Sequence, residues 1–345
     1  MANWTTFALI LTIFGLSSKA FAGDVAGCLP SLERALCYSP PMEHWAIDQE
    51  NIPRNLRAYQ ERRCLPVPTN LKTTLLSVYD KFPREIQQAF CEIKKIFIVS
   101  GDVSYGALAD FYFDPATVRI QQGEWNPRFS GKPIGYVLEI SEKNRFKGET
   151  ASAYATRVLR ARFGSAAGNV EQLPLGVYET PFAENGALAT TIVHEIGHML
   201  GRAQKMTSTY FLPFSEGAWS KVSFKLEDGS YSLRHATPEY SSRMLQKTLS
   251  NSDVRPTLDL FRRAGVATLY GATSPQEDLA EFFMLNYYGN LKWSLQGEVV
   301  FDLQREIATN AAFKTKKDII NRFMSQPEPF SLKNRGVVSG ELGPM

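Results

Sequence analysis

Two histidines and a glutamate stand close together at His194, Glu195 and His198. On a helix, residues four apart lie on one face about one turn apart, so both imidazoles can reach one tetrahedral Zn²⁺. Glu195 lies beside them, where it can take a proton from water that the metal activates. The chain has only four histidines, so a chance pair at this spacing around a glutamate is improbable. The motif predicts one catalytic zinc ion, with Glu195 as general base.

A catalytic zinc of this kind needs a third protein ligand and an open position. In the longer pattern HExxHxxGxxH the third ligand is a histidine, but this chain has Gln204 at that position. His235 is another candidate, on a strand of a predicted hairpin. A carboxylate from a distant helix is the remaining option, and Glu277 and Glu281 lie four residues apart on one face of such a helix.

Ser274 and Pro275 fit the N-cap and the first position of that second helix. Ser274 and Glu277 also match a capping box, in which Glu277 would serve only the start of the helix. The pairing of Glu277 with Glu281, together with the need for a third ligand, favours the metal. We therefore expect Glu277 to complete the ligand set of His194 and His198.

Residues 270–283 read YGATSPQEDLAEFF. This segment resembles one in the anthrax lethal factor family of peptidases, within the gluzincins, which has Tyr-Gly-x-Thr-Asn and then Glu-x-x-Ala-Glu with an aromatic residue. The resemblance implies that Glu277 is the third zinc ligand, that Glu281 supports a zinc-binding histidine, and that Tyr270 stabilises the transition state. It also implies a zincin-like metallopeptidase domain that hydrolyses peptide bonds in a protein or peptide substrate. It covers both motif helices and the chain from about Leu71 onward.

One departure from that family is the distance of 79 positions between His198 and Glu277, which is longer than the family suggests. Residues 203–260 would then form an insertion, with a hairpin around Asp228-Gly229. The departure bears on substrate recognition more than on the metal site.

Hydrophobic periodicity predicts the elements that must position these residues. Helices are expected at 71–79, 83–95, 150–163, 187–200 and 274–288, with Gly201 as the C-cap of the fourth. Strands are expected at 96–99, 109–113, 117–121 and 135–140, the second and third as a hairpin or strand pair. Helices and strands mixed without regular β-α-β alternation favour an α+β fold. Substrate would lie extended along an edge strand, in a cleft above the helix of the motif.

Residues 1–22 resemble an export signal. An apolar run from Phe7 to Leu16 precedes Ala20-Phe21-Ala22, which a signal peptidase could cut. The run is too short to span a bilayer, and no later stretch has the roughly 20 apolar residues of a membrane helix. We expect a periplasmic or secreted protein without an integral membrane segment after cleavage. Lipidation at Cys28 is an alternative, because Val25-Ala26-Gly27-Cys28 resembles a lipobox.

The four cysteines, Cys28, Cys37, Cys64 and Cys91, all lie in the first third of the chain. An even number in an oxidising compartment predicts two disulfides. The shortest loops would join Cys28 to Cys37 and Cys64 to Cys91, and we expect that pairing. The chain then divides into an export signal at 1–22, a cysteine-containing extension at 23–64, a catalytic domain at 65–330 and a tail at 331–345.

The formal net charge of +3 and the absence of a lysine and arginine cluster argue against a nucleic-acid partner. The metal chemistry leaves two alternatives to a peptidase open. One is a zinc amidase or esterase that acts on a cell-wall substrate, and the other is an exported, non-catalytic binding protein on the same scaffold. The substrate, the cleavage preference and the oligomeric state do not follow from the sequence.

Overall fold

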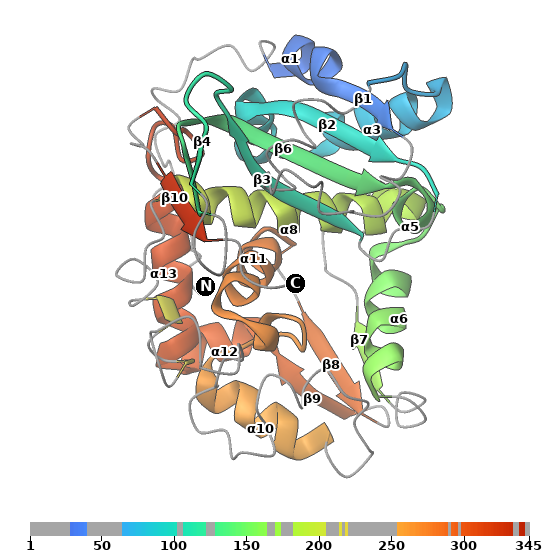
Figure 1. The fold of residues 1–345 in the computed structure, drawn as a ribbon. Coiled ribbons are helices and arrows are strands. Elements are labelled where there is room, and N and C mark those ends of the chain that lie inside the picture. Colours follow the sequence, from blue (N-terminus) through green and yellow to red (C-terminus); the bar gives the residue numbers. More distant parts are fainter. Residues whose placement is uncertain are drawn as a thin grey trace, which may run out of the picture.

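The computed structural model describes residues 28–39, 64–101, 106–121, 128–163, 170–173, 182–204, 214–215, 218–219, 254–288, 291–295, 298–333 and 338–341. These parts of the chain form a mixed α+β fold, which agrees with the predicted fold class (Figure 1). No helix within them is long and apolar enough to cross a membrane. The predicted export signal, His235 and the hairpin around Asp228-Gly229 lie outside the described residues.

A four-stranded sheet with the order β1-β2-β6-β3 forms the upper part of the molecule in Figure 1. The strands β1 (Leu36–Ser39), β2 (Ile93–Val99) and β6 (Pro133–Ser141) run parallel to one another. The fourth strand, β3 (Ala107–Phe113), pairs antiparallel with β6 and, in the part of the chain that the structure describes, has no second neighbour in the sheet. One edge of β3 is therefore available for contacts other than strand pairing.

The inner strands β2 and β6 are apolar along most of their length and buried on both faces, as inner parallel strands usually are. Side chains of one face join the main hydrophobic core, and those of the other face belong to a small second cluster. The first set includes Ile96, Ile98, Leu138 and Ile140, and the second Phe97, Val99 and Val137. The sheet is thus covered unequally, and its larger apolar face needs helices to bury it.

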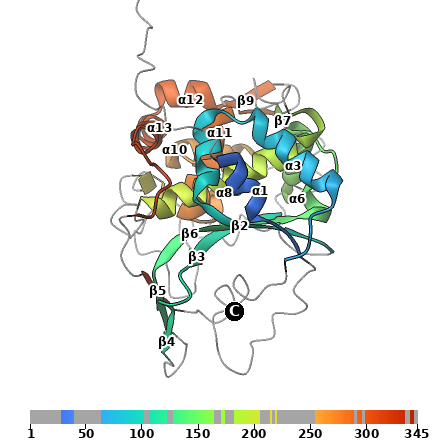
Figure 2. The same ribbon diagram turned by 90° about the horizontal axis from the view of Figure 1, so that it is seen from above.

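Those helices lie on one side of the sheet, as the view from above shows for α1 (Cys28–Ala35), α3 (Thr69–Lys81) and α8 (Gly186–Ala203) (Figure 2). Both α3 and α4 (Arg84–Ala89) contribute buried side chains to the main core. The helix α8 is buried along almost its whole length and runs beneath the sheet (Figure 1). Burial on nearly every side is expected for a helix that lies between two layers of structure.

The part of the molecule below α8 in Figure 1 contains most of the later elements. A sheet of β7, β8 and β9 lies there, together with the helices that follow α8, whereas β4, β5 and β10 form a third small sheet. The bounds are α5 (Glu142–Arg145), α6 (Ala151–Phe163), α10 (Val254–Ala264), α11 (Pro275–Tyr288), α12 (Leu303–Thr309), α13 (Ala311–Met324), β4 (Arg119–Gln121), β5 (Arg128–Gly131), β7 (Val170–Leu173), β8 (Lys292–Leu295), β9 (Glu298–Asp302) and β10 (Val338–Glu341).

Three predictions about local structure are wrong. The helix expected at 83–95 ends at Ala89, and β2 already begins at Ile93, because the apolar residues after Cys91 are buried in the sheet. The segments 109–113 and 117–121 do not pair, since β3 pairs with β6 and β4 pairs with β5. Gly201 does not end the helix, which continues to Ala203 with its last turn bound to β3 by Arg202.

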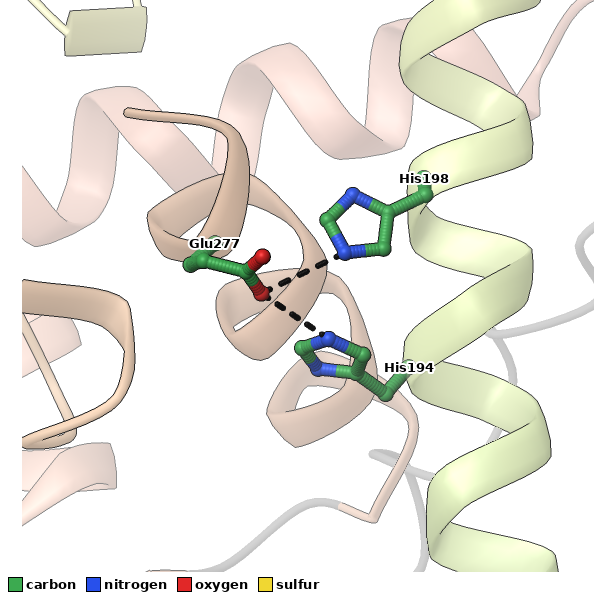
Figure 3. A group of neighbouring side chains, drawn as sticks. All are labelled: His194, His198 and Glu277. Atoms are coloured by element: carbon green, nitrogen blue, oxygen red, sulfur yellow. Dashed lines mark ion pairs between the residues drawn. The ribbon is translucent and has the colours of Figure 1, made fainter. Parts of the chain in front are cut away.

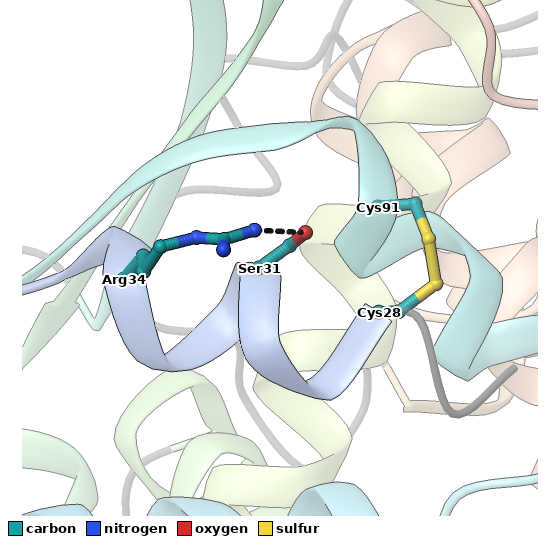
Figure 4. The surroundings of a disulfide bond; sticks show 4 residues. All are labelled: Cys28, Ser31, Arg34 and Cys91. Carbon is teal, nitrogen blue, oxygen red and sulfur yellow. Dashed lines mark hydrogen bonds between the residues drawn. A yellow bond between two sulfur atoms is a disulfide. The ribbon is translucent and has the colours of Figure 1, made fainter.

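The predicted disulfide pairing is also wrong, although all four cysteines are bonded. The bonds join Cys28 to Cys91 and Cys37 to Cys64, each with a Cα–Cα distance of 4.8 Å. Cys28 begins α1, which packs against the 3₁₀ turn that contains Cys91 (Figure 4). The backbone bridge between Tyr38 and Leu65 brings Cys64 beside Cys37. Tertiary contacts, and not loop length, therefore select the partners.

A buried ion pair ties α11 to the rest of the lower part. Lys316 of α13 donates to Asp278 Oδ2 at 2.6 Å and to the carbonyl of Gly265 at 2.7 Å, and Trp219 Nε1 donates to the same carboxylate at 3.2 Å. The two charged side chains are 1% and 2% exposed. Asp278 directly follows Glu277, so this pair fixes the first turn of α11.

Replacement of Lys316 by methionine should destabilise the fold by about 3–5 kcal/mol, because it leaves the Asp278 carboxylate buried without its counter-ion. Urea unfolding followed by circular dichroism measures the loss. The matched control is Lys333→Met, which removes an exposed ion pair with Glu328 and should leave the midpoint unchanged. Equal midpoints for the Lys316 variant and the control would contradict this account.

Candidate metal centre

The helix α8 carries the HExxH motif on a rigid and buried element. Thr190 and Thr191 are buried, and their hydroxyls donate to backbone carbonyls four residues earlier in the helix, so neither remains unpaired. One turn later, His194 and His198 project from the same face, with 4.9 Å between their ring centroids. The helical spacing expected from the sequence is therefore present.

The helix α11 brings Glu277 to these two imidazoles (Figure 3). Glu277 Oε2 lies 3.1 Å from His194 Nε2 and 3.3 Å from His198 Nε2. Ser274 Oγ accepts a bond of 3.2 Å from the backbone N–H of Glu277, so the predicted N-cap is present. The Glu277 side chain is not used in the helix start, since it faces the histidines.

Close packing of two helices makes this approach possible. A methyl group on Gly197 would lie 2.8 Å from Ala280 Cα and 3.1 Å from its carbonyl oxygen. Glycine and alanine at this crossing therefore let the backbones of α8 and α11 lie nearer than larger side chains would allow. Glu277 and Glu281, one turn apart on α11, then both reach the histidines.

Glu281 holds the other nitrogen of His194, with Oε1 lying 2.7 Å from Nδ1. An N–H at Nδ1 donated to this carboxylate leaves the Nε2 lone pair facing Glu277 and His198. A carboxylate in this position also strengthens the imidazole as a metal ligand. This is the role that the resemblance to the lethal factor family implies for Glu281.

The charges around the cluster favour a bound cation. Burial opposes protonation of His194, but the carboxylates of Glu277, Glu281 and Glu195 outweigh it and raise its pKa well above the ordinary value. Burial likewise opposes ionisation of Glu277, yet the two imidazoles lower its pKa far below the usual range. The site is thus strongly negative when the histidines are neutral.

The three side chains also suit a metal geometrically. One donor atom from each of His194, His198 and Glu277 can be chosen so that all lie within 4.8 Å of one another. Glu277 Oε2 is buried and, among the described residues, has no hydrogen-bond partner, although it lies between two imidazole nitrogens. A single ion bound by all three would satisfy it, and two imidazoles with one carboxylate form a common ligand set for zinc.

Glu195 points from α8 toward the edge strand. Its Oε2 accepts a hydrogen bond of 2.7 Å from the backbone N–H of Ala109 in β3, and only 6% of the residue is exposed. Arg202, two turns further along α8, donates to the carbonyl of the same Ala109 and lies 3.6 Å from the Asp110 carboxylate. The two side chains together hold β3 against the helix.

Tyr270 lies beside the histidines, with its ring centroid 5.6 Å from that of His194. Although 45% of the residue is exposed, burial and the nearby charges of Glu277, Glu281 and Glu195 raise the pKa of its phenol. The phenol therefore stays protonated at neutral pH and can donate a hydrogen bond into the cleft.

An open cleft of about 580 Å³ runs between β3 and the metal-binding side chains. Its walls combine apolar side chains of the edge strand with the polar groups of α8 and α11. The lining residues are Ala107, Leu108, Ala109, Phe111, Glu195, His198, Gly201, Arg202, Tyr270, Ser274, Gln276, Glu277 and Leu279. The structure thus brings together every predicted site residue that it describes.

Arg202 is a residue of the cleft that the sequence interpretation missed. Its position four residues after His198 puts it on the same face of the helix, and this spacing was a usable signal. What it binds could not be foreseen, because β3 was expected to pair with 117–121 instead of lying beside α8.

Gly197→Ala tests the helix crossing. Alanine in a helix interior is normally more favourable than glycine by about 1 kcal/mol. Here the added methyl overpacks the contact with Ala280, and we expect a net loss of about 1–3 kcal/mol in unfolding free energy. Urea unfolding gives the sign directly, and a variant as stable as the wild type or more stable would show that the helices are not in close contact.

Comparison of the chain with protein-family models, with curated proteins and with solved structures found no match to any of them. The resemblance of residues 270–283 to the lethal factor family therefore stays a prediction from the sequence. Functional inference for this chain rests on the side chains of the candidate metal centre and on the cleft above them.

Proposed function

We propose that this protein is an exported, zinc-dependent endopeptidase with a zincin-like catalytic domain. The observation that carries the proposal is the convergence of His194, His198 and Glu277 from two helices, with Glu195 and Tyr270 at the same cleft. Each of the five residues was expected in this role from the sequence. A binding protein would have no use for the general base.

Zinc bound by the two histidines and Glu277 would polarise the scissile carbonyl and lower the pKa of water toward ~7. The chain's own residues supply the rest of the chemistry. Glu195 accepts the proton of the attacking water and passes it to the leaving amine. Tyr270 donates its phenolic proton in a hydrogen bond to the oxygen that gains charge in the transition state. Glu281 keeps the proton on Nδ1 of His194 throughout.

The edge strand β3 is the natural support for an extended substrate. The backbone N–H and C=O of Ala109 are both bonded to side chains of α8, so they are not available to a substrate main chain as they stand. A substrate must therefore pair with β3 at neighbouring residues or displace Glu195 from Ala109. Displacement would move the carboxylate from the strand to the attacking water.

The proposed location follows from the covalent structure. Two disulfides within the first third of the chain form and persist in an oxidising compartment. They support export, together with the apolar run at the start of the sequence. The periplasm and the cell exterior both fit.

Metal content tests the ligand set. Wild-type protein should retain one zinc ion per chain after dialysis, measured by elemental analysis, and Glu277→Ala should lose it. Glu281→Ala should bind zinc about 10–100-fold more weakly, because it removes only the support of a ligand. The control is Glu298→Ala, an exposed glutamate paired with Arg255, which should keep full zinc content. An unchanged zinc content in the Glu277 variant would show that another residue is the third ligand.

Glu195→Gln tests the reaction. The amide can still accept from the Ala109 N–H but cannot take a proton, so the fold and zinc content should persist while kcat falls by at least about 100-fold. Cleavage of a denatured protein mixture, followed by mass spectrometry of the products, measures the activity. A variant with wild-type activity would remove Glu195 from the proposed role. A wild-type protein that binds zinc, leaves all peptides intact and releases products from peptidoglycan would contradict the endopeptidase proposal and support a cell-wall amidase.

A further inference from the structure

A second arginine lies beside the residue that precedes the cleft lining. Arg145 is the last residue of α5, which directly follows β6, and its guanidinium lies against Gly106, the residue before β3. A methyl group on Gly106 would be only 1.7 Å from Arg145 Nη2 and 2.2 Å from Cζ. The guanidinium therefore fills the space that a side chain at position 106 would take, one residue before the cleft lining begins at Ala107.

Tyr154 of α6 holds this guanidinium from the other side. Arg145 Nη2 donates to the Tyr154 hydroxyl at 3.1 Å, and Cζ lies 4.6 Å from the centroid of the ring. Arg145 is thus held in place by Gly106 and Tyr154, at the end of β3 from which the cleft extends toward Arg202.

The hydrogen-bonding capacity of Arg145 is largely unused. A guanidinium has five N–H donors. Nη1 donates to the carbonyl of Asn144 at 3.0 Å and Nη2 to Tyr154, while the buried Nε has no partner among the described residues. In the same part of the chain no carboxylate lies within ion-pair distance of this guanidinium.

Two neighbouring arginines make the contrast clear. Arg202, at the cleft, is bonded to the Ala109 carbonyl and lies near the Asp110 carboxylate. Arg157, which also lies over the Tyr154 ring, makes two bonds of 2.9 Å to the Glu149 carboxylate. Both make direct contact with a carboxylate of the chain itself. Among the described residues Arg145 makes no such contact, although its charge contributes, after that of Arg157, to the lowered pKa of Glu149. A guanidinium that is held in place beside a cleft and has unused N–H donors is well suited to bind a carboxylate of a substrate.

We propose that Arg145 is a specificity-determining residue that binds a carboxylate of the peptide substrate, either an acidic side chain or the C-terminal carboxylate. The inference rests on the proposed peptidase function and adds a substrate class to it. The carboxylate would lie beyond Ala107, at a fixed distance along β3 from the bond that is cleaved. Peptides without a carboxylate at that distance are the poorer substrates.

The test compares the wild-type protein, loaded with zinc, with three variants. Arg145→Met removes the charge. Gly106→Ala keeps the charge but pushes the guanidinium aside, since its flexible end is the group in the way. Arg157→Met is the matched control. It removes a cation that lies over the same tyrosine ring but is already paired with the Glu149 carboxylate. Each protein digests two randomised octapeptide pools, one with amidated and one with free C-termini.

We expect wild type and Arg157→Met to favour a carboxylate at one fixed position, by about tenfold or more in kcat/KM over the corresponding amide. Arg145→Met and Gly106→Ala should both lose this preference. A preference that persists in the amidated pool identifies an acidic side chain, and one confined to the free pool identifies the C-terminus. A wild type that cleaves without such a preference, or an Arg145 variant that keeps it, overturns the proposal and leaves the peptidase function standing.

Binding separates the two proposals if no peptide is cleaved. The inactive Glu195→Gln protein, with and without Arg145→Met, is incubated with the same pools, and bound peptides are recovered by ultrafiltration and identified by mass spectrometry. Enrichment of carboxylate-bearing peptides that requires Arg145 supports the site even if the catalytic account fails. Equal peptide populations on the two proteins contradict it.

Discussion

The close crossing of α8 and α11 at Gly197 and Ala280 is the contact on which the candidate centre depends. Neither helix alone offers more than two metal ligands, and Glu277 reaches the imidazoles only because the backbones approach so nearly. A larger residue at either position would push the two helices apart and draw Glu277 away from the imidazoles. The geometry of the site is therefore set by packing before any ion binds.

That packing concentrates negative charge in a buried place. Glu195, Glu277 and Glu281 surround two imidazoles, and burial makes their mutual repulsion costly. On the far side of α11, the Asp278–Lys316 pair holds the first turn of the helix. The first turn of α11 thus has two neighbouring carboxylates with different partners. Asp278 is neutralised by Lys316, whereas Glu277 faces the two imidazoles.

The local part of this picture could be predicted, and the tertiary part could not. Helical spacing and an N-cap are properties of neighbouring residues, so the roles of His194, His198 and Glu277 as a candidate ligand set follow from the sequence. Strand partners depend on the whole sheet, and for this reason the pairing of β3 was wrong and the contacts of Arg202 were missed. The same holds for the cysteines, whose partners are set by contacts between segments far apart in the chain: α1 with the 3₁₀ turn at Cys91, and β1 with Leu65. Nothing in the sequence pointed to Arg145, because its role depends on the tertiary contact of its guanidinium with Gly106.

The strand β1 and its two disulfides have a consequence for the order of biosynthetic events. The first described segment, residues 28–39, adds a parallel strand to the sheet and is cross-linked to the 3₁₀ turn before β2 through Cys28–Cys91 and to Cys64 through Cys37. Parallel pairing of distant segments is slow, and in a reducing cytosol this edge would be held by backbone hydrogen bonds and side-chain packing without the covalent cross-links. For an exported chain, the sheet above α8 is then fully secured only after translocation. A hydrolase assembled in this order would mature outside the cytosol that made it.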